Sequence, residues 1–201
     1  MNGGGITRGV SVLSFPEPPL DKDEILRYAG AGEGPDVGKL LDGVLDDLLP
    51  GLVYRICFAE TSVETDGENV FFGFSLARSR SLSRRLADCG SAVVFAATVG
   101  FEPDILSRAE RFDPLRALLV HAAGAERVEA LCDAFCSKLG DGYEQRFSPG
   151  YGDLPLSFQR EIFDFLNPGK NIGIVLSEKM IMSPSKSVTA IVGKRRNSKN
   201  G

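Results

Sequence analysis

Six consecutive apolar residues at positions 92–97, Ala-Val-Val-Phe-Ala-Ala, constrain the fold of this chain more than any other segment. A strand with one face in water alternates apolar and polar residues, whereas a strand covered on both faces shows an unbroken apolar run. The run at 92–97 therefore predicts a strand in the centre of a sheet.

Further strands are indicated by alternation and by turn residues. Residues 52–60 alternate apolar side chains on one face, which predicts a second strand. Thr-Asp-Gly-Glu at 65–68 predicts a hairpin turn, because Asp-Gly favours the tight turns that join antiparallel strands. The other strands expected lie at 70–74, 172–176, 179–182 and 187–192.

Helices are indicated where apolar residues recur three and four positions apart. The clearest one begins at the cap Asp36, carries one apolar stripe over 37–49 and stops at Pro50. A long helix is expected at 113–139, either in one piece or as two helices joined at Gly124. The other helices expected lie at 21–29, 79–89 and 157–166.

The order of these segments predicts the fold class. Strands precede and follow a helical middle without the regular alternation of a doubly wound sheet, which favours an α+β fold. At 201 residues with 43% hydrophobic residues, the chain can form a sizeable core in a single domain. We expect one domain over 1–193, followed by a basic, disordered tail at 194–201.

The charge and hydropathy patterns exclude two classes of partner. With 23 Lys and Arg against 27 Asp and Glu, the chain lacks the excess of positive charge that general nucleic-acid binding requires. No apolar run approaches the roughly 18 to 20 residues that span a bilayer, and the first residues do not resemble a signal peptide. We expect a cytoplasmic protein with neither nucleic acid nor membrane as a partner.

The four cysteines, Cys57, Cys89, Cys132 and Cys136, lie in apolar surroundings, which predicts reduced and buried thiols. Cys132 and Cys136 are four residues apart, so on a helix they would share a face and could chelate a metal. There is no second pair, and the only histidine, His121, lies about three helical turns upstream. We therefore expect no metal site.

The loop at 146–156, Arg-Phe-Ser-Pro-Gly-Tyr-Gly-Asp-Leu-Pro-Leu, is the candidate binding segment. Its prolines and glycines preclude a regular helix or strand. Arg146 can hold a carboxylate by two parallel hydrogen bonds, and Gly150 lets a ligand approach the backbone. Tyr151 offers an aromatic face to a cation or a flat base. S-adenosylmethionine has a carboxylate, positive centres and an aromatic base, and would use all three residues.

A rigid turn is the alternative interpretation of this loop. Arg146 would then pair with Asp153, and Tyr151 would pack on Pro149 or Pro155. The residues of the loop alone leave both interpretations open.

A longer pattern surrounds the loop. It starts with Arg-Phe-Ser-Pro-Gly-Tyr-Gly-Asp at 146–153, and the residues upstream at 25–28 and 96–100 belong to it as well. Its remaining members are Gln159, Ile162-Phe163, Leu166, Ile172-Gly173-Ile174-x-Leu176-Ser177-Glu178, Met182-x-Pro184 and Ser187-Val188. Together they resemble the C-terminal, S-adenosylmethionine-binding activation domain of cobalamin-dependent methionine synthase, in its free-standing bacterial form.

The resemblance implies a fold and a function. The fold would be a single α+β domain with a mainly antiparallel sheet and flanking helices. In this family, oxidised cob(II)alamin is rescued by reductive methylation, in which S-adenosylmethionine supplies the methyl group and a flavodoxin-type donor supplies an electron. The partner would be a cobalamin-dependent methionine synthase that lacks its own activation domain. No Asp-x-His-x-x-Gly string is present to ligate cobalt, so the cobalamin would be carried by that partner.

The resemblance also implies a binding site. Arg146 would hold the carboxylate of the ligand, Gly150 would allow close backbone approach, and Tyr151 would line the adenosyl or sulfonium side. Glu129 would contact the amino group, with a helix residue paired to Arg127 as the alternative. The full set of implied site residues is Arg146, Ser148, Pro149, Gly150, Tyr151 and Glu129.

One departure from the family leaves other functions open. The paired tyrosines that the family carries near the ligand are replaced here by Lys-Arg-Arg-Asn at 194–197. The alternatives are a regulatory module that binds S-adenosylmethionine or another nucleoside without methylation, and a reactivator of a different corrinoid methyltransferase.

Overall fold

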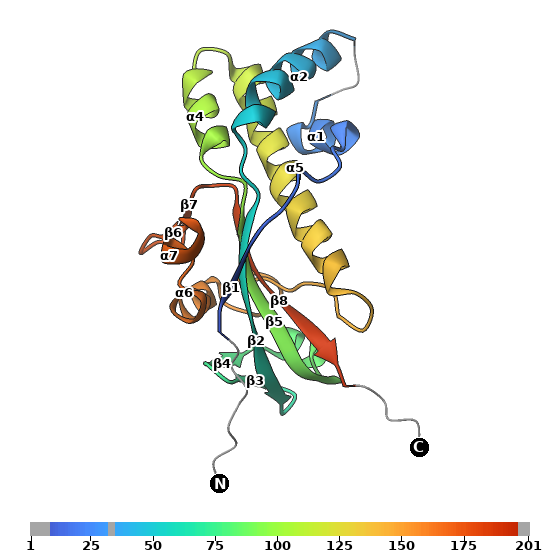
Figure 1. The fold of residues 1–201 in the computed structure, drawn as a ribbon, viewed down its shortest axis with the longest axis vertical. Helices are drawn as coiled ribbons and strands as arrows, with labels where there is room; N and C mark the ends of the chain where they lie inside the picture. The colour runs from blue at the N-terminus through green and yellow to red at the C-terminus, as the bar shows by residue number, and fades with distance from the viewer. Residues whose placement is uncertain (1–8, 32–34, 197–201) are drawn as a thin grey trace.

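A six-stranded antiparallel sheet forms the centre of the molecule (Figure 1). The computed structural model describes residues 9–31 and 35–196. The strands in this part of the chain are β1 (Ser11–Ser14), β2 (Arg55–Thr65), β3 (Asn69–Phe72), β4 (Leu76–Arg78), β5 (Cys89–Thr98), β6 (Val175–Leu176), β7 (Met182–Ser183) and β8 (Ser187–Arg195).

Helices surround this sheet and extend beyond one end of it. Figure 1 shows the long helix α5 running beside the sheet, with α1, α2 and α4 gathered around its first half and with α6 and α7 on the other side of the sheet. The α-helices are α1 (Lys22–Ala29), α2 (Pro35–Leu48), α3 (Arg80–Arg85), α4 (Glu102–Ala109), α5 (Pro114–Leu139), α6 (Gln159–Leu166) and α7 (Pro168–Ile172). Two short 3₁₀ helices, η1 (Leu49–Gly51) and η2 (Leu156–Phe158), precede β2 and α6.

Strand β5 is central, as its apolar run predicts. The sheet order is β4-β3-β2-β5-β8, with β1 added beside β2 and with β6 and β7 in a separate two-stranded ribbon. In β5, Val94 pairs with Ala59 of β2 on one side and with Ile191 of β8 on the other. All the pairings are antiparallel, so the α+β class and the mainly antiparallel sheet are confirmed.

The two faces of β5 are buried in different cores, which explains why it has no polar face. Val94 and its face pack in the core completed by α6, whereas Phe95 and its face pack against α5 residues such as Phe135. A third core joins α1, α2 and the first half of α5. A buried phenylalanine contributes about 1.5–3 kcal/mol through the water it excludes, so Phe95 is a principal anchor of α5 on the sheet.

Helix α5 is one continuous helix of 26 residues, which decides between the two forms expected for 113–139. It begins at the cap Asp113, whose side chain accepts from the backbone N–H of Arg116, and it ends at Gly140. Gly124 does not break it. A Cβ at Gly124 would lie 2.9 Å from Pro103, so the glycine allows α4 to approach α5 closely.

Several predicted boundaries are wrong. The helix expected at 157–166 begins at Gln159, and the strands expected at 172–176 and 179–182 are reduced to β6 and β7. Helix α2 begins at Pro35, so Asp36 lies in the first turn and is not the cap. The helix expected at 79–89 stops at Arg85, because Cys89 already pairs with Arg195 as the first residue of β5.

The boundary of the expected tail is also corrected. Strand β8 continues through Lys194 and Arg195, two residues that the sequence places in the tail. Arg195 donates its backbone N–H to the carbonyl of Gly142 and its side chain to Glu144 Oε1 at 2.6 Å, which holds the strand end in place. The rest of the expected tail, 197–201, lies outside the described residues.

Candidate functional site

The loop at 146–156 is attached to the outer edge of β8, the last strand of the sheet. Phe147 and Ile191 exchange two backbone hydrogen bonds of 2.8 Å each, and Tyr143 forms a second bridge to Lys194. Phe147 is buried in the core beside α6, so it anchors the segment. The residues on either side of it are thereby placed next to β8.

A pocket of about 290 Å³ lies where this loop meets β8, α5 and α6, and we call it the loop pocket. All six residues that the family resemblance implies line this pocket. One comes from α5 and five come from the loop: Glu129, Arg146, Ser148, Pro149, Gly150 and Tyr151. The remaining wall consists of Gln159, Met182, Ser187, Val188 and Thr189. None of them was predicted as a site residue, although all except Thr189 belong to the longer sequence pattern around the loop.

Arg146 is held in this wall by two carboxylates of α5. Its guanidinium forms ion pairs with Glu129 and Asp133. Burial disfavours the charged form of Arg146, but the negative charges of Glu129 and Asp133 outweigh this effect and raise the pKa of Arg146 above its usual value. Arg146 does not pair with Asp153, so the rigid-turn interpretation fails for this residue. Glu129 likewise pairs with Arg146 and not with Arg127.

Asp153 fixes the far end of the loop to helix α3. Its carboxylate accepts from Ser79 Oγ at 2.5 Å and from the backbone N–H groups of Arg80 and Ser81 at 2.8 and 3.1 Å. The hydrogen bond from Ser79 is the largest cause of the lowered pKa of Asp153. The carboxylate therefore stays ionised and serves as an anchor at the helix N-terminus.

Gly150 and Tyr151 form the exposed side of the pocket. Gly150 has φ of +93°, a conformation that residues with a Cβ rarely adopt. Tyr151 is 62% exposed, and its ring meets Phe147 edge-on at a centroid distance of 6.3 Å. One edge of the tyrosine is thus supported while most of the ring remains free for contact with a ligand.

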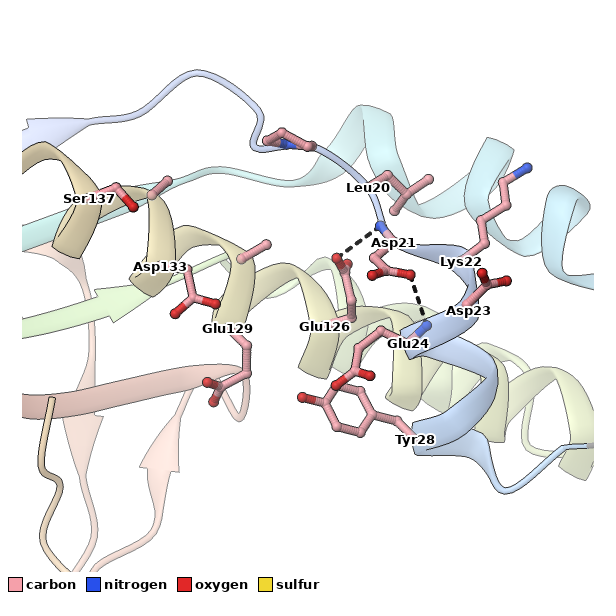
Figure 2. Close-up of a pocket in the computed structure, with 13 residues that line it drawn as sticks. Leu20, Asp21, Lys22, Asp23, Glu24, Tyr28, Glu126, Glu129, Asp133 and Ser137 are labelled. Atoms are coloured by element: carbon pink, nitrogen blue, oxygen red, sulfur yellow. Dashed lines mark hydrogen bonds between the residues drawn. The ribbon is translucent and has the colours of Figure 1, made fainter. Parts of the chain in front are cut away.

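A second and larger hollow of about 820 Å³ separates α1 from α5, and we call it the α1–α5 groove. Figure 2 shows Glu24 and Tyr28 of α1 facing the side of α5 that carries Glu126. Glu129 lines both hollows, so the groove adjoins the loop pocket. The carboxylates of the groove are Asp21, Asp23, Glu24, Glu126, Glu129 and Asp133.

Several of these carboxylates already have partners in the protein. Asp21 caps α1 by accepting from the N–H of Glu24, and its own N–H donates to Glu126 Oε1 at 3.1 Å. Glu24 accepts from Arg27 at 2.7 and 2.5 Å, and this contact lowers the pKa of Glu24 to about 2. Some of the carboxylates in the groove therefore serve to hold α1 in place.

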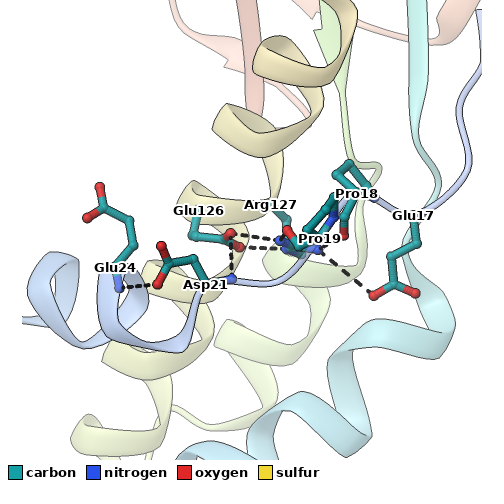
Figure 3. A network of polar contacts seen from close by, with 7 residues as sticks. All are labelled: Glu17, Pro18, Pro19, Asp21, Glu24, Glu126 and Arg127. Carbon is teal, nitrogen blue, oxygen red and sulfur yellow. Dashed lines mark hydrogen bonds and ion pairs between the residues drawn. The ribbon is translucent and has the colours of Figure 1, made fainter. Parts of the chain in front are cut away.

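Arg127 underlies the groove and ties the segment before α1 to α5 (Figure 3). Its side chain is fully buried and donates to both carboxylate oxygens of Glu126, at 2.6 and 2.7 Å. It also donates to the carbonyls of Pro18 and Pro19 at 2.8 and 2.6 Å. Nothing in the local sequence around Arg127 indicated this role, because its backbone partners lie more than 100 residues away.

The four cysteines are free thiols, and Cys136 is the least buried of them. Burial raises the pKa of Cys57 to about 11 and also raises the pKa of Cys132, so both stay protonated at neutral pH. Among the described residues, no group of three or more His, Cys, Asp or Glu side chains is arranged to hold a metal ion. None of the described helices combines the length and apolar character needed to cross a bilayer.

No family model and no curated protein sequence matches the chain. A solved structure does match, namely the crystal structure of the MetH reactivation domain bound to AdoHcy. The two superimpose with a TM-score of 0.69 at 17% sequence identity, over 96% of this chain and 80% of the other. This chain has the reactivation-domain fold of methionine synthase. The resemblance drawn from the sequence motifs is thus confirmed at the level of fold.

The reactivation-domain fold accounts for nearly all of the chain, because 96% of it is matched. At 17% identity the match carries no residue assignments. The loop pocket therefore stands on its own geometry: one guanidinium fixed by two carboxylates, a left-handed glycine and an exposed aromatic ring.

Proposed function

We propose that this protein binds S-adenosylmethionine in the loop pocket and acts as a separate reactivation subunit for a cobalamin-dependent methionine synthase. The observation that carries the proposal is the convergence of all six motif residues on one pocket, in a chain with the reactivation-domain fold. Five of these residues are neighbours in the loop, and Glu129 joins them from α5, 17 positions before Arg146.

The charges of the pocket fit such a ligand. S-adenosylmethionine carries one carboxylate, one ammonium and one sulfonium, so its net charge is positive. Arg146 with Glu129 and Asp133 leaves one excess negative charge beside the loop. Two of the five guanidinium N–H donors of Arg146 serve the two carboxylates, which leaves donors for the carboxylate of the ligand. Glu129 is the nearby acceptor for the ammonium group.

The exposed side of the pocket fits the rest of the ligand. Gly150 has no side chain to block the approach of the ligand to the backbone. Tyr151 offers a free aromatic face for the adenine ring or for the sulfonium, whose positive charge is attracted to a ring face. Ser148 and Pro149 complete this side.

The reaction needs a second protein. A flavodoxin-type donor supplies one electron to cob(II)alamin, and the methyl group then moves from the sulfonium to cobalt, leaving S-adenosylhomocysteine. Reaction of this kind needs the two reacting atoms within about 3–3.5 Å of each other. The cobalamin would be held by the partner, and the open side of the loop pocket around Tyr151 is the surface that would face it.

Titration calorimetry with S-adenosylmethionine tests the binding step. Arg146→Ala is expected to weaken binding by about 1.5–3 kcal/mol, since charged hydrogen bonds to the ligand are lost. Arg116→Ala is the matched control, because Arg116 also pairs with two carboxylates, Asp47 and Glu110, but lies at the far end of α5. Absence of heat and of a thermal shift at millimolar ligand would reject the ligand.

Visible spectroscopy tests the reactivation step. We would mix the protein with a truncated methionine synthase in the cob(II)alamin state, a reduced flavodoxin and S-adenosylmethionine. Methylcobalamin is expected only when all components are present, and Arg146→Ala is expected to abolish its formation. Binding without methylation would favour a regulatory module. Activity with a different corrinoid protein, but not with methionine synthase, would favour a reactivator of that other methyltransferase.

A further inference from the structure

Two polar side chains in the wall of the loop pocket have buried oxygens without a partner. Gln159 is 5% exposed and Thr189 is 2% exposed, and both line the pocket. Gln159 Oε1 and Thr189 Oγ1 make no hydrogen bond to any residue in the described part of the chain. Gln159 belongs to the longer sequence pattern but was not predicted as a site residue, and Thr189 lies outside that pattern.

The fold brings these two residues together from different elements. Gln159 is the first residue of α6, which follows the loop directly. Thr189 lies on the same face of β8 as Ile191, since residues two apart on a strand share a face, and Ile191 packs in the core beside α6. Both side chains therefore lie between α6 and the sheet, behind the loop residues that form the front of the pocket.

Orphaned buried polar groups are uncommon, because each has lost its water without gaining a partner. An apolar side chain of similar size would avoid this cost at either position. Their coincidence in one pocket wall indicates that a ligand satisfies them. The terminal torsion of glutamine is broad, so a small rotation turns the amide of Gln159 toward the pocket.

The chemistry of these two groups indicates which part of the ligand they would bind. A glutamine oxygen only accepts, so its partner must be an N–H or O–H donor. The amide of glutamine matches adenine by accepting from the 6-amino group and donating to N7, whereas a 6-oxo base presents two acceptors, O6 and N7, on the same edge. The pocket also offers flat and polarisable contacts to a base, through Tyr151 and Met182. A ribose hydroxyl could also donate to the glutamine oxygen, but a ribose has no aromatic face to stack on Tyr151.

We propose that Gln159, assisted by Thr189, recognises the amino-bearing edge of the adenine base and makes the loop pocket selective for adenosyl over other nucleosides. This inference rests on the proposed function, because it assumes that a nucleoside occupies the loop pocket. It adds the part of the site that decides which base is accepted.

The test compares S-adenosylhomocysteine with S-inosylhomocysteine by calorimetry, because the second carries a 6-oxo group in place of the 6-amino group. The wild-type protein is expected to prefer the adenosyl compound by about tenfold or more. Gln159→Leu is expected to bind both compounds with nearly equal affinity, because the amide that accepts from the 6-amino group is removed. Thr189→Val is expected to reduce the preference by a smaller factor.

Gln145→Leu is the matched control, because Gln145 is an exposed glutamine in the preceding segment that contacts Arg85. Thermal unfolding tests whether the variants fold, and Gln159→Leu is expected to melt at or above the wild-type temperature. If the wild-type protein binds the two compounds with equal affinity, the inference about Gln159 is wrong but the proposed function stands. An equal loss of affinity for both compounds in Gln159→Leu also overturns the inference, because Gln159 would then contact a part of the ligand that the two compounds share. Absence of binding to both compounds rejects the proposed function, and the base subsite with it.

Discussion

The α1–α5 groove and the loop pocket differ in a way that size does not reveal. The groove is almost three times larger, at about 820 Å³ against about 290 Å³. Its carboxylates are largely committed to the protein, since Asp21 caps α1 and Glu126 binds Arg127. The loop pocket carries a fixed guanidinium and an exposed aromatic ring, together with the two orphaned oxygens.

We infer from this contrast that the loop pocket, which has unsatisfied polar groups, is a better candidate for ligand binding than the larger groove. Groups that bind other parts of the chain stabilise the fold, and groups left without partners can bind a ligand. Glu129 belongs to both hollows, and its ion pair with Arg146 marks the boundary between them. Changes in the groove should alter stability, and changes in the loop pocket should alter ligand affinity.

Arg127→Met should give the largest effect and should act on stability. The substitution leaves the carboxylate of Glu126 buried without its cation and two proline carbonyls without their donor. Breaking a buried pair from one side costs about 3–5 kcal/mol. Urea denaturation measures this loss, with the exposed Arg27→Met as control, for which only a small change is expected because the ion pair of Arg27 is screened by water. An equally mild effect at Arg127 would contradict the structural role of the network.

Gly150→Val should act mainly on the loop pocket. A β-branched residue at φ of +93° is strained by about 1–3 kcal/mol, and its side chain would occupy the approach to the backbone. We expect the affinity for S-adenosylmethionine to fall at least as far as in Arg146→Ala. Gly140→Val is the control for strain alone, because Gly140 has φ of +87° but lies outside the pocket. Similar losses of affinity in the two variants would show that strain and not blockage is responsible.

Lys186 is a second buried cation. Unlike Arg127, it forms no ion pair with a carboxylate in the described part of the chain. It is 8% exposed and donates from Nζ to His121 Nδ1 at 2.6 Å, and Asp104 is the nearby acid. Burial lowers the pKa of Lys186 from 10.5 to about 8. In the folded protein Lys186 therefore loses its proton before the unfolded chain does, so this group makes the protein more stable as the pH rises from 8 to 10.5.

Lys186→Met should stabilise the protein at pH 7 by about 1–2 kcal/mol, because the cost of the buried charge is removed. Its advantage over the wild type should shrink as the pH rises from 8 to 10.5. Thermal unfolding of both proteins across this range measures the difference. A constant difference over the whole range would show that the pKa of Lys186 is close to its ordinary value.

Asp23→Asn should give the smallest effect. Asp23 lies in the first turn of α1 and lines the groove without touching the loop pocket. Surface substitutions of this kind change stability by about 0.5 kcal/mol or less, and the affinity for S-adenosylmethionine should be unchanged. Calorimetry and urea denaturation of this variant check both expectations. A large loss of affinity would move the ligand from the loop pocket into the groove.

The sequence by itself determined the elements whose signal lies in neighbouring residues. The apolar run at 92–97 predicted the central strand, and the helix expected at 113–139 agrees with α5 at both ends. The motif at 146–153 located the loop. Each of these signals is local, because caps, turns and periodic faces depend on residues within a few positions of one another.

Elements with weak local signals were missed. Strand β1 has four residues and is largely exposed, so no apolar alternation marks it. Helix α4 has eight residues and lies against α5, and α7 has five. Short elements such as these depend on packing against the rest of the fold more than on their own sequence.

Only the tertiary structure decided how the site is assembled. Arg146 pairs with Glu129 and Asp133 on a helix that precedes it, and Thr189 of β8 and Gln159 of α6 line the same pocket. Arg127 is buried because residues before α1 fold back across α5. These contacts join residues that are between 13 and 109 positions apart, and no local pattern encodes such separations. They arise because the sheet and α5 must bury their apolar faces, and this burial brings the polar groups between them to one place.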